Sequence, residues 1–209
     1  MDRDKIAQAM PSVRQEFEAL KEMLREGRMN AATSALFGAA IAWGGQLRTI
    51  YAKDDRAALM AGDALTRFFV TRYRGMPEPP HLDDAPPAAW FLMAFTAFPY
   101  LDALMDETVI GEHVGFDEDG NWLVGRVLAG DYDGARLKVD KGPKGWRFDL
   151  LALYQDKAIA LQNYIETSHG GDFDAFLWRY VADHDLVFDM DRAFRPSEIM
   201  GGSDADPRA

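Results

Sequence analysis

The segment ADHDLVFDMD, residues 182–191, gathers the residue types that most readily hold a metal ion. It contains one histidine and four carboxylates: Asp183, His184, Asp185, Asp189 and Asp191. Mixed imidazole and carboxylate ligands could bind a hard divalent cation. The same charges also suit the solvated end of a helix, and their spacing fixes no coordination geometry. We therefore predict no metal site here, and an enzyme with a carboxylate-bound metal stays the third of three functional hypotheses.

The acidic turn FDEDGNW, residues 116–122, invites a calcium interpretation. It offers oxygen ligands at alternate positions: Asp117, Asp119 and Asn121. An EF-hand loop needs glycine at its sixth place and a bidentate glutamate at its twelfth. Trp122 and Leu128 occupy those places, so the spacing fails. The Asp-Gly step favours a plain hairpin turn.

Catalytic side chains are hard to nominate in this sequence. Of the four histidines, His81 falls in a proline-rich loop and His169 beside a glycine pair, whereas His113 falls in an expected strand. Histidine in a strand is more often packed or hydrogen-bonded than catalytic, yet His113 is our first choice for a reactive group. The sequence carries no GxSxG, HExxH, P-loop or GxGxxG pattern. We assign no catalytic residue and no cofactor.

Aromatic residues suggest a binding pocket. The stretch of residues 88–101 is the most aromatic in the chain, and an expected sheet follows it. Aromatic walls with a few polar groups are typical of small-molecule sites. We predict a pocket between this helix and the sheet, with five ligand-binding residues: Trp90, Tyr100, His113, Trp122 and Arg126.

These residues need an α+β fold to position them. The periodicity is helical over residues 1–105, twofold over residues 108–151 and helical again over residues 152–195. We predict one domain over residues 1–200, mostly helical, with a curved antiparallel sheet of about four strands packed on helices. Glycine-rich and Asp-Gly steps supply the hairpin turns. The tail of residues 201–209 is expected to be disordered.

Two details of the helical part depend on small residues. Gly38, Gly44 and Gly45 leave room for another backbone to come close to the second long helix. A third helix is expected from about Asp55 to Arg74. The five prolines that follow, within residues 76–88, exclude a helix interior and a central strand and predict a loop.

Side chains of the expected strands alternate between two faces. Trp146, Phe148 and Leu150 are predicted to face the core, which leaves Arg147 and Asp149 toward water. Arg126 breaks the alternation because it shares a face with large apolar residues. Either it lines a polar cavity or the register shifts at Gly125 through a bulge, and both alternatives stay open.

The segment GPKGWRFDL, residues 142–150, resembles a late strand of the nuclear transport factor two-like, or SnoaL-like, superfamily. The continuation over residues 150–181 is similar to uncharacterised bacterial proteins in which such a strand leads into two helices. The resemblance implies a curved sheet wrapped around helices into a cone, a fold that serves isomerases, dehydratases, cyclases and non-enzymatic binding proteins. About 105 residues of helix precede the sheet here, so the resemblance assigns no catalytic residue to this chain.

The composition of the chain disfavours two classes of binding partner. With 34 acidic and 23 basic residues, the net charge of -11 disfavours nucleic acid and anionic membranes. The apolar runs of residues 31–45 and 88–101 are shorter than the roughly 20 residues that span a bilayer. Cysteine is absent, and the charged start of the chain has no apolar signal core, so we expect a cytoplasmic, bacterial protein.

We rank two functional hypotheses above that of an enzyme with a carboxylate-bound metal. The first is a protein that binds a small molecule in the predicted pocket, with catalysis left undecided. The second is an acidic interaction module without catalysis, which holds a protein partner through the loop PEPPHLDDAPP, residues 77–87, or forms a homodimer.

Overall fold

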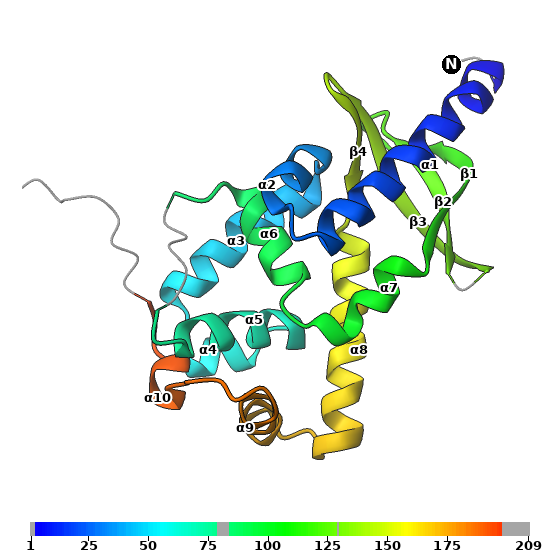
Figure 1. The fold of residues 1–209 in the computed structure, drawn as a ribbon. Helices are drawn as coiled ribbons and strands as arrows, with labels where there is room; N and C mark the ends of the chain where they lie inside the picture. The colour runs from blue at the N-terminus through cyan, green and yellow to red at the C-terminus, as the bar shows by residue number, and fades with distance from the viewer. Residues whose placement is uncertain (1–2, 79–83, 129, 198–209) are drawn as a thin grey trace, which may run out of the picture.

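In the computed structural model, residues 3–78, 84–128 and 130–197 are described. The elements are α1 Arg3–Arg25, α2 Met29–Ala32, the 3-10 helix η1 Thr33–Ala35, α3 Ala39–Lys53, α4 Arg56–Met60, α5 Ala64–Gly75, α6 Pro87–Phe95, the 3-10 helix η2 Pro99–Leu101, α7 Asp102–Asp106, β1 Thr108–Phe116, β2 Trp122–Leu128, β3 Asp131–Gly142, β4 Gly145–Asp149, α8 Leu151–His169, α9 Phe173–Asp183 and α10 Met190–Ala193 (Figure 1). The predicted α+β class is confirmed. Residues 79–83, with His81, and the tail of residues 201–209 lie outside the described part.

The four strands form one open antiparallel sheet in the order β1-β2-β3-β4, as the twofold periodicity predicted. A cross-strand row places Trp122 opposite Val139 and Val139 opposite Phe148, so large apolar side chains share one face. Helix α1 crosses the sheet (Figure 1). There, the Phe17 ring meets the Phe148 ring edge-on at 5.1 Å. This contact joins the sheet to the helical core.

Arg126 owes its place to an irregularity in the sheet. The β2–β3 register shifts between Gly125 and Val127, so the bulge interpretation is the correct one. The Arg126 residue is 7% exposed, and its side chain pairs with Asp133 on β3 and Asp156 on α8. A buried cation is thus matched by two carboxylates, and the pairs tie the sheet to α8.

The prediction that Asp149 faces water is wrong. Trp146, Phe148 and Leu150 are buried as predicted, but Asp149 is buried too, at 7% exposure. Its Oδ2 accepts a hydrogen bond from the Ala39 N–H at 2.9 Å and its Oδ1 one from the Ala40 N–H at 3.0 Å. The carboxylate therefore caps the amino terminus of α3, where free N–H groups favour an anion.

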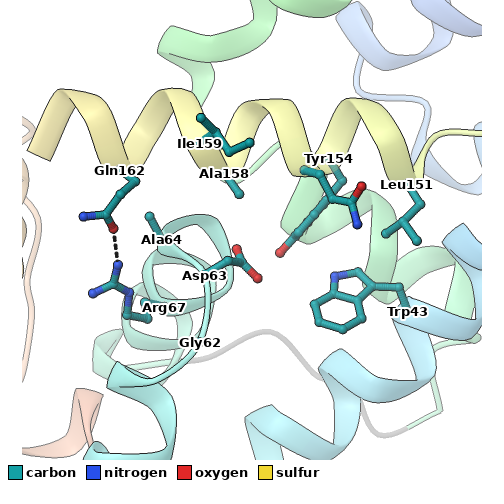
Figure 2. Close-up of a pocket in the computed structure, with 11 residues that line it drawn as sticks. Trp43, Gly62, Asp63, Ala64, Arg67, Leu151, Tyr154, Ala158, Ile159 and Gln162 are labelled. Atoms are coloured by element: carbon teal, nitrogen blue, oxygen red, sulfur yellow. Dashed lines mark hydrogen bonds between the residues drawn. The ribbon is translucent and has the colours of Figure 1, made fainter. Parts of the chain in front are cut away.

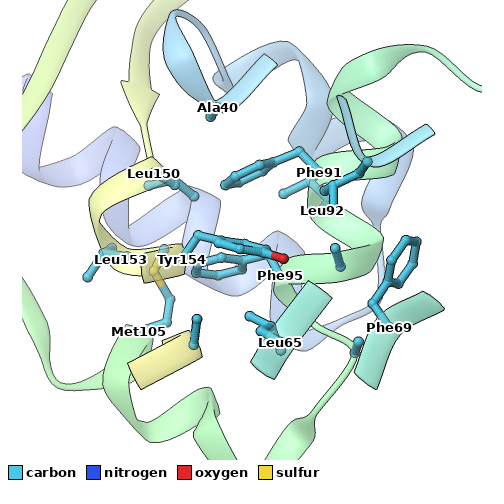
Figure 3. Close-up of a cluster of buried hydrophobic side chains, with 14 of the residues drawn as sticks. Ala40, Leu65, Phe69, Phe91, Leu92, Phe95, Met105, Leu150, Leu153 and Tyr154 are labelled. Carbon is cyan, nitrogen blue, oxygen red and sulfur yellow. The ribbon is translucent and has the colours of Figure 1, made fainter. Parts of the chain in front are cut away.

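One of the small residues of α3 serves close packing and another does not. A Cβ atom on Gly44 would lie 1.9 Å from the carbonyl oxygen of Pro87, so glycine lets α3 and α6 approach backbone to backbone. A Cβ on Gly45 would meet nothing within 4 Å. The α3–α6 pair borders a core of aromatic and aliphatic side chains that includes Phe91, Phe95 and Tyr154 (Figure 3).

The expected helix of residues 55–74 is two helices. Helix α4 ends at Met60, and α5 begins after Asp63, whose side chain accepts the N–H of Thr66 as an N-cap. A cap residue adopts extended backbone angles, so it interrupts the helix. This break opens the space in which the candidate site lies.

Candidate functional site

A cavity of about 670 Å³ lies between α3, the α4–α5 break and α8 (Figure 2). Its walls come from three helices and one turn: Trp43, Gly62, Asp63, Ala64, Arg67, Leu151, Tyr154, Gln155, Ala158, Ile159 and Gln162. Figure 2 shows Trp43, Leu151 and Tyr154 at one end, Arg67 and Gln162 at the other, and Asp63 between them. The cavity therefore has an aromatic end and a polar end.

Helix α8 supplies one wall because its spacing puts the right residues on one face. Leu151, Ala158 and Gln162 are separated by seven and four residues, spacings that fall on the same side of an α-helix. Leu161, which is offset from this face, is buried in the core. Helix α8 therefore contributes side chains both to the core and to one wall of the cavity.

Ring contacts and hydrogen bonds position the side chains of the aromatic end. The Trp43 and Tyr154 rings meet edge-on at 6.0 Å. The Thr66 hydroxyl donates to Asp63 Oδ2 at 2.6 Å, so the Tyr154 hydroxyl donates to Thr66 Oγ1 at 2.7 Å. Burial raises the pKa of Tyr154, and Asp63 adds to this effect. Tyr154 thus stays a neutral wall of the cavity at ordinary pH.

The polar end centres on Arg67. Its Nη2 donates to the side-chain oxygen of Gln162, and its guanidinium lies 5.1 Å from the centre of the Phe173 ring. The Nε atom is buried and has no hydrogen-bond partner. Burial lowers the pKa of Arg67, while the charge of Asp63 opposes that shift. A cation is thus held in partly desolvated surroundings with a neutral amide as its hydrogen-bond partner.

Two of the five predicted ligand-binding residues lie apart from each other. Trp90 is fully buried, with its ring edge-on to Tyr51 at 5.2 Å, so it belongs to the helical core. Tyr100 is 67% exposed and its hydroxyl lies 3.2 Å from Nε2 of His184. Neither residue lines the cavity of Figure 2.

The structure brings His113 and Trp122 together. Their rings meet edge-on at 5.2 Å, and burial lowers the pKa of His113. The Nε2 atom of His113 is buried without a hydrogen-bond partner. Arg126 instead forms ion pairs with Asp133 and Asp156. The five residues therefore do not form one cluster, and the ligand role assigned to each of them stays a prediction.

The acidic segment of residues 182–191 contains aspartates that lie at helix ends. Asp183 pairs with Arg179 at 2.9 Å, and Asp189 caps α10. Among the described residues, no group of three or more His, Asp or Glu side chains is arranged to hold a metal ion. Within the same ranges, no helix combines the length and apolar character needed to cross a bilayer.

Sequence reasoning missed the residues of the cavity for an identifiable reason. Arg67 lies within the single helix that the sequence predicts from about Asp55 to Arg74, so no loop or cavity is expected beside it. The signal that could have located the break is GDALT, residues 62–66, in which glycine and an Asp N-cap precede Thr66.

Comparison with protein-family models, curated proteins and solved structures finds no match for this chain.

Proposed function

We propose that this chain binds a small molecule in the cavity between α3, α5 and α8. The observation that carries the proposal is the cavity itself, which at about 670 Å³ falls within the roughly 300–1,000 Å³ of ordinary ligand sites. Its apolar walls would bury a ligand body, and its few polar groups would fix the orientation. The proposed site differs from the pocket that the sequence predicted between the aromatic helix and the sheet.

A binding assay with a neutral fluorescent probe tests the proposal. The apolar dye phenylnaphthylamine should gain emission when it enters the cavity. Gln155 is an exposed residue of α8 at the cavity, so Gln155→Trp should fill the entrance and reduce dye binding without disturbing the core. Asn163→Trp adds the same ring at an exposed position of α8 that does not line the cavity.

The comparison of the two variants decides the outcome. Dye binding that falls in Gln155→Trp and persists in Asn163→Trp supports the cavity as the site. Equal binding by both variants would place the dye elsewhere and contradict the proposal. Absence of dye binding by the wild type, together with no thermal shift in a fragment screen, would remove small-molecule binding altogether.

We also keep the SnoaL-like relationship and a cytoplasmic location as proposals. Support for the relationship is that GPKGWRFDL spans the last turn and the last strand of the sheet and leads directly into α8. A complete absence of cysteine supports the location. The alternative interaction module depends on residues 77–87, of which residues 79–83 lie outside the described part.

A further inference from the structure

Among the described residues, Arg67 is a cation without an ion-pair partner. Its hydrogen-bond partner is the neutral amide of Gln162, and its Nε is buried without a partner. In the part of the chain that the structure describes, no carboxylate forms an ion pair with it, whereas the buried Arg126 has two. Charges removed from water are normally paired, so Arg67 would gain from an anionic hydrogen-bond partner.

Asp63 is the competing charge in the cavity, and its needs are met. Oδ1 accepts the N–H of Thr66 at 2.8 Å and Oδ2 accepts its hydroxyl at 2.6 Å. The carboxylate also sits at the amino terminus of α5, where the helix dipole stabilises a negative charge. The net charge of -11 acts against an anion at long range, but salt screens it beyond about 8 Å. Asp63 attracts Arg67 at longer range but shares no hydrogen bond with it, so Arg67 is the charged group of the cavity that lacks an anionic hydrogen-bond partner among the described residues.

The remaining walls define the rest of the ligand. Trp43, Leu151 and Tyr154 form the aromatic end, away from Arg67 (Figure 2). From Leu151 to Gln162 helix α8 rises about 16 Å, which sets the upper limit on the distance between the two ends of a ligand. An elongated molecule with one apolar end and one polar end fits these dimensions.

We propose that the ligand is an amphipathic monocarboxylate, with its carboxylate on Arg67 and its apolar body against Trp43, Leu151 and Tyr154. This inference rests on the proposed function and names the ligand class of the same site. The carboxylate would complete the hydrogen bonding of the guanidinium, which binds planar carboxylates well.

Three probes with the same body separate the charge from the apolar contact. Phenylbutyrate, phenylbutyramide and phenylbutylamine are titrated against the dye complex by displacement. Hydrogen bonds to a charged group contribute enough for phenylbutyrate to bind about tenfold or more tightly than the amide. The amine should bind no better than the amide, because the carboxylate of Asp63 is already satisfied.

A pair of variants tests the role of Arg67 in the intact chain. Gln162→Glu places a carboxylate of the protein beside Arg67, so it should reduce the preference for phenylbutyrate over phenylbutyramide about tenfold. Asn163→Glu adds the same charge at an exposed neighbouring position that does not line the cavity, and it should leave both affinities unchanged. Thermal melts confirm that both variants fold.

The outcomes distinguish the two proposals. Equal affinity of the wild type for phenylbutyrate and phenylbutyramide overturns the carboxylate inference while small-molecule binding stands. Tightest binding of the amine overturns it as well and makes Asp63 the recognising group. If the dye enters the cavity and none of the three probes displaces it, the ligand class is wrong. If the dye itself does not bind, the proposed function and this inference fail together.

Discussion

Replacement of Gly44 by alanine should destabilise the protein, whereas the same replacement at Gly45 should not. A Cβ atom on Gly44 would lie 1.9 Å from the Pro87 carbonyl oxygen and 3.1 Å from the Phe91 backbone nitrogen. These neighbours are backbone atoms, so no side-chain rotation relieves the overlap. Helix α6 would have to move away from α3.

The size of the effect follows from the distances. The carbonyl oxygen must retreat by about 1.5 Å to reach the 3.4 Å at which ordinary contact begins. Overpacking of this kind costs about 1–3 kcal/mol or more, and alanine returns up to about 1 kcal/mol through its helix propensity. We expect Gly44→Ala to lose about 2 kcal/mol of unfolding free energy. Gly45→Ala meets no atom within 4 Å and should gain about 0.5–1 kcal/mol.

Urea unfolding followed by circular dichroism measures both variants against the wild type. Thermal midpoints should differ in the same sense, by about 2–4 °C for each kcal/mol in a chain of this size. The two substitutions add the same methyl group to neighbouring positions of one helix, so a general effect of alanine would shift both midpoints alike. A parallel shift, or a Gly44→Ala variant as stable as the wild type, would refute the close approach of α3 and α6.

Three further predictions concern carboxylates that accept hydrogen bonds in the folded protein. Asp149→Ala should cost about 3 kcal/mol of unfolding free energy, because buried N–H groups at the start of α3 lose a charged acceptor; Asp149→Asn should cost less than half as much in the same urea titration. Arg126→Met should raise the pKa of Asp133, which the hydrogen bond from Arg126 lowers, in a carboxyl NMR titration, and an unchanged pKa would contradict that pairing. The hydrogen bond from Asn121 holds the pKa of Asp117 at about 2, below the ordinary 3.8. The ionised form therefore stabilises the folded state, so the advantage of the wild type over Asp117→Asn should be full above pH 3.8 and vanish as pH falls through about 2; an advantage independent of pH would refute this.

Local periodicity predicted the parts of the fold in which neighbouring residues carry the information. The twofold alternation after Thr108 predicted four strands, and the same alternation placed Trp146 and Phe148 in the core, where both are found. Side-chain direction in a strand is set by the backbone pleat, so the sequence is sufficient for such assignments. The glycines of α3 predicted a close approach by another backbone, but of Gly44 and Gly45 only Gly44 makes one.

The cavity and its charge depended on contacts that no local pattern contains. Asp149 was expected to face water because the strand alternates, yet it caps α3 at a position 110 residues earlier in the chain. Asp63 divides an apparently continuous helix, and the space beside that break becomes a cavity only because α8 packs across it from residues far along the chain. Residue order determines the elements and their buried faces; which polar side chain finds which partner, and where a void remains, is decided only when the elements pack.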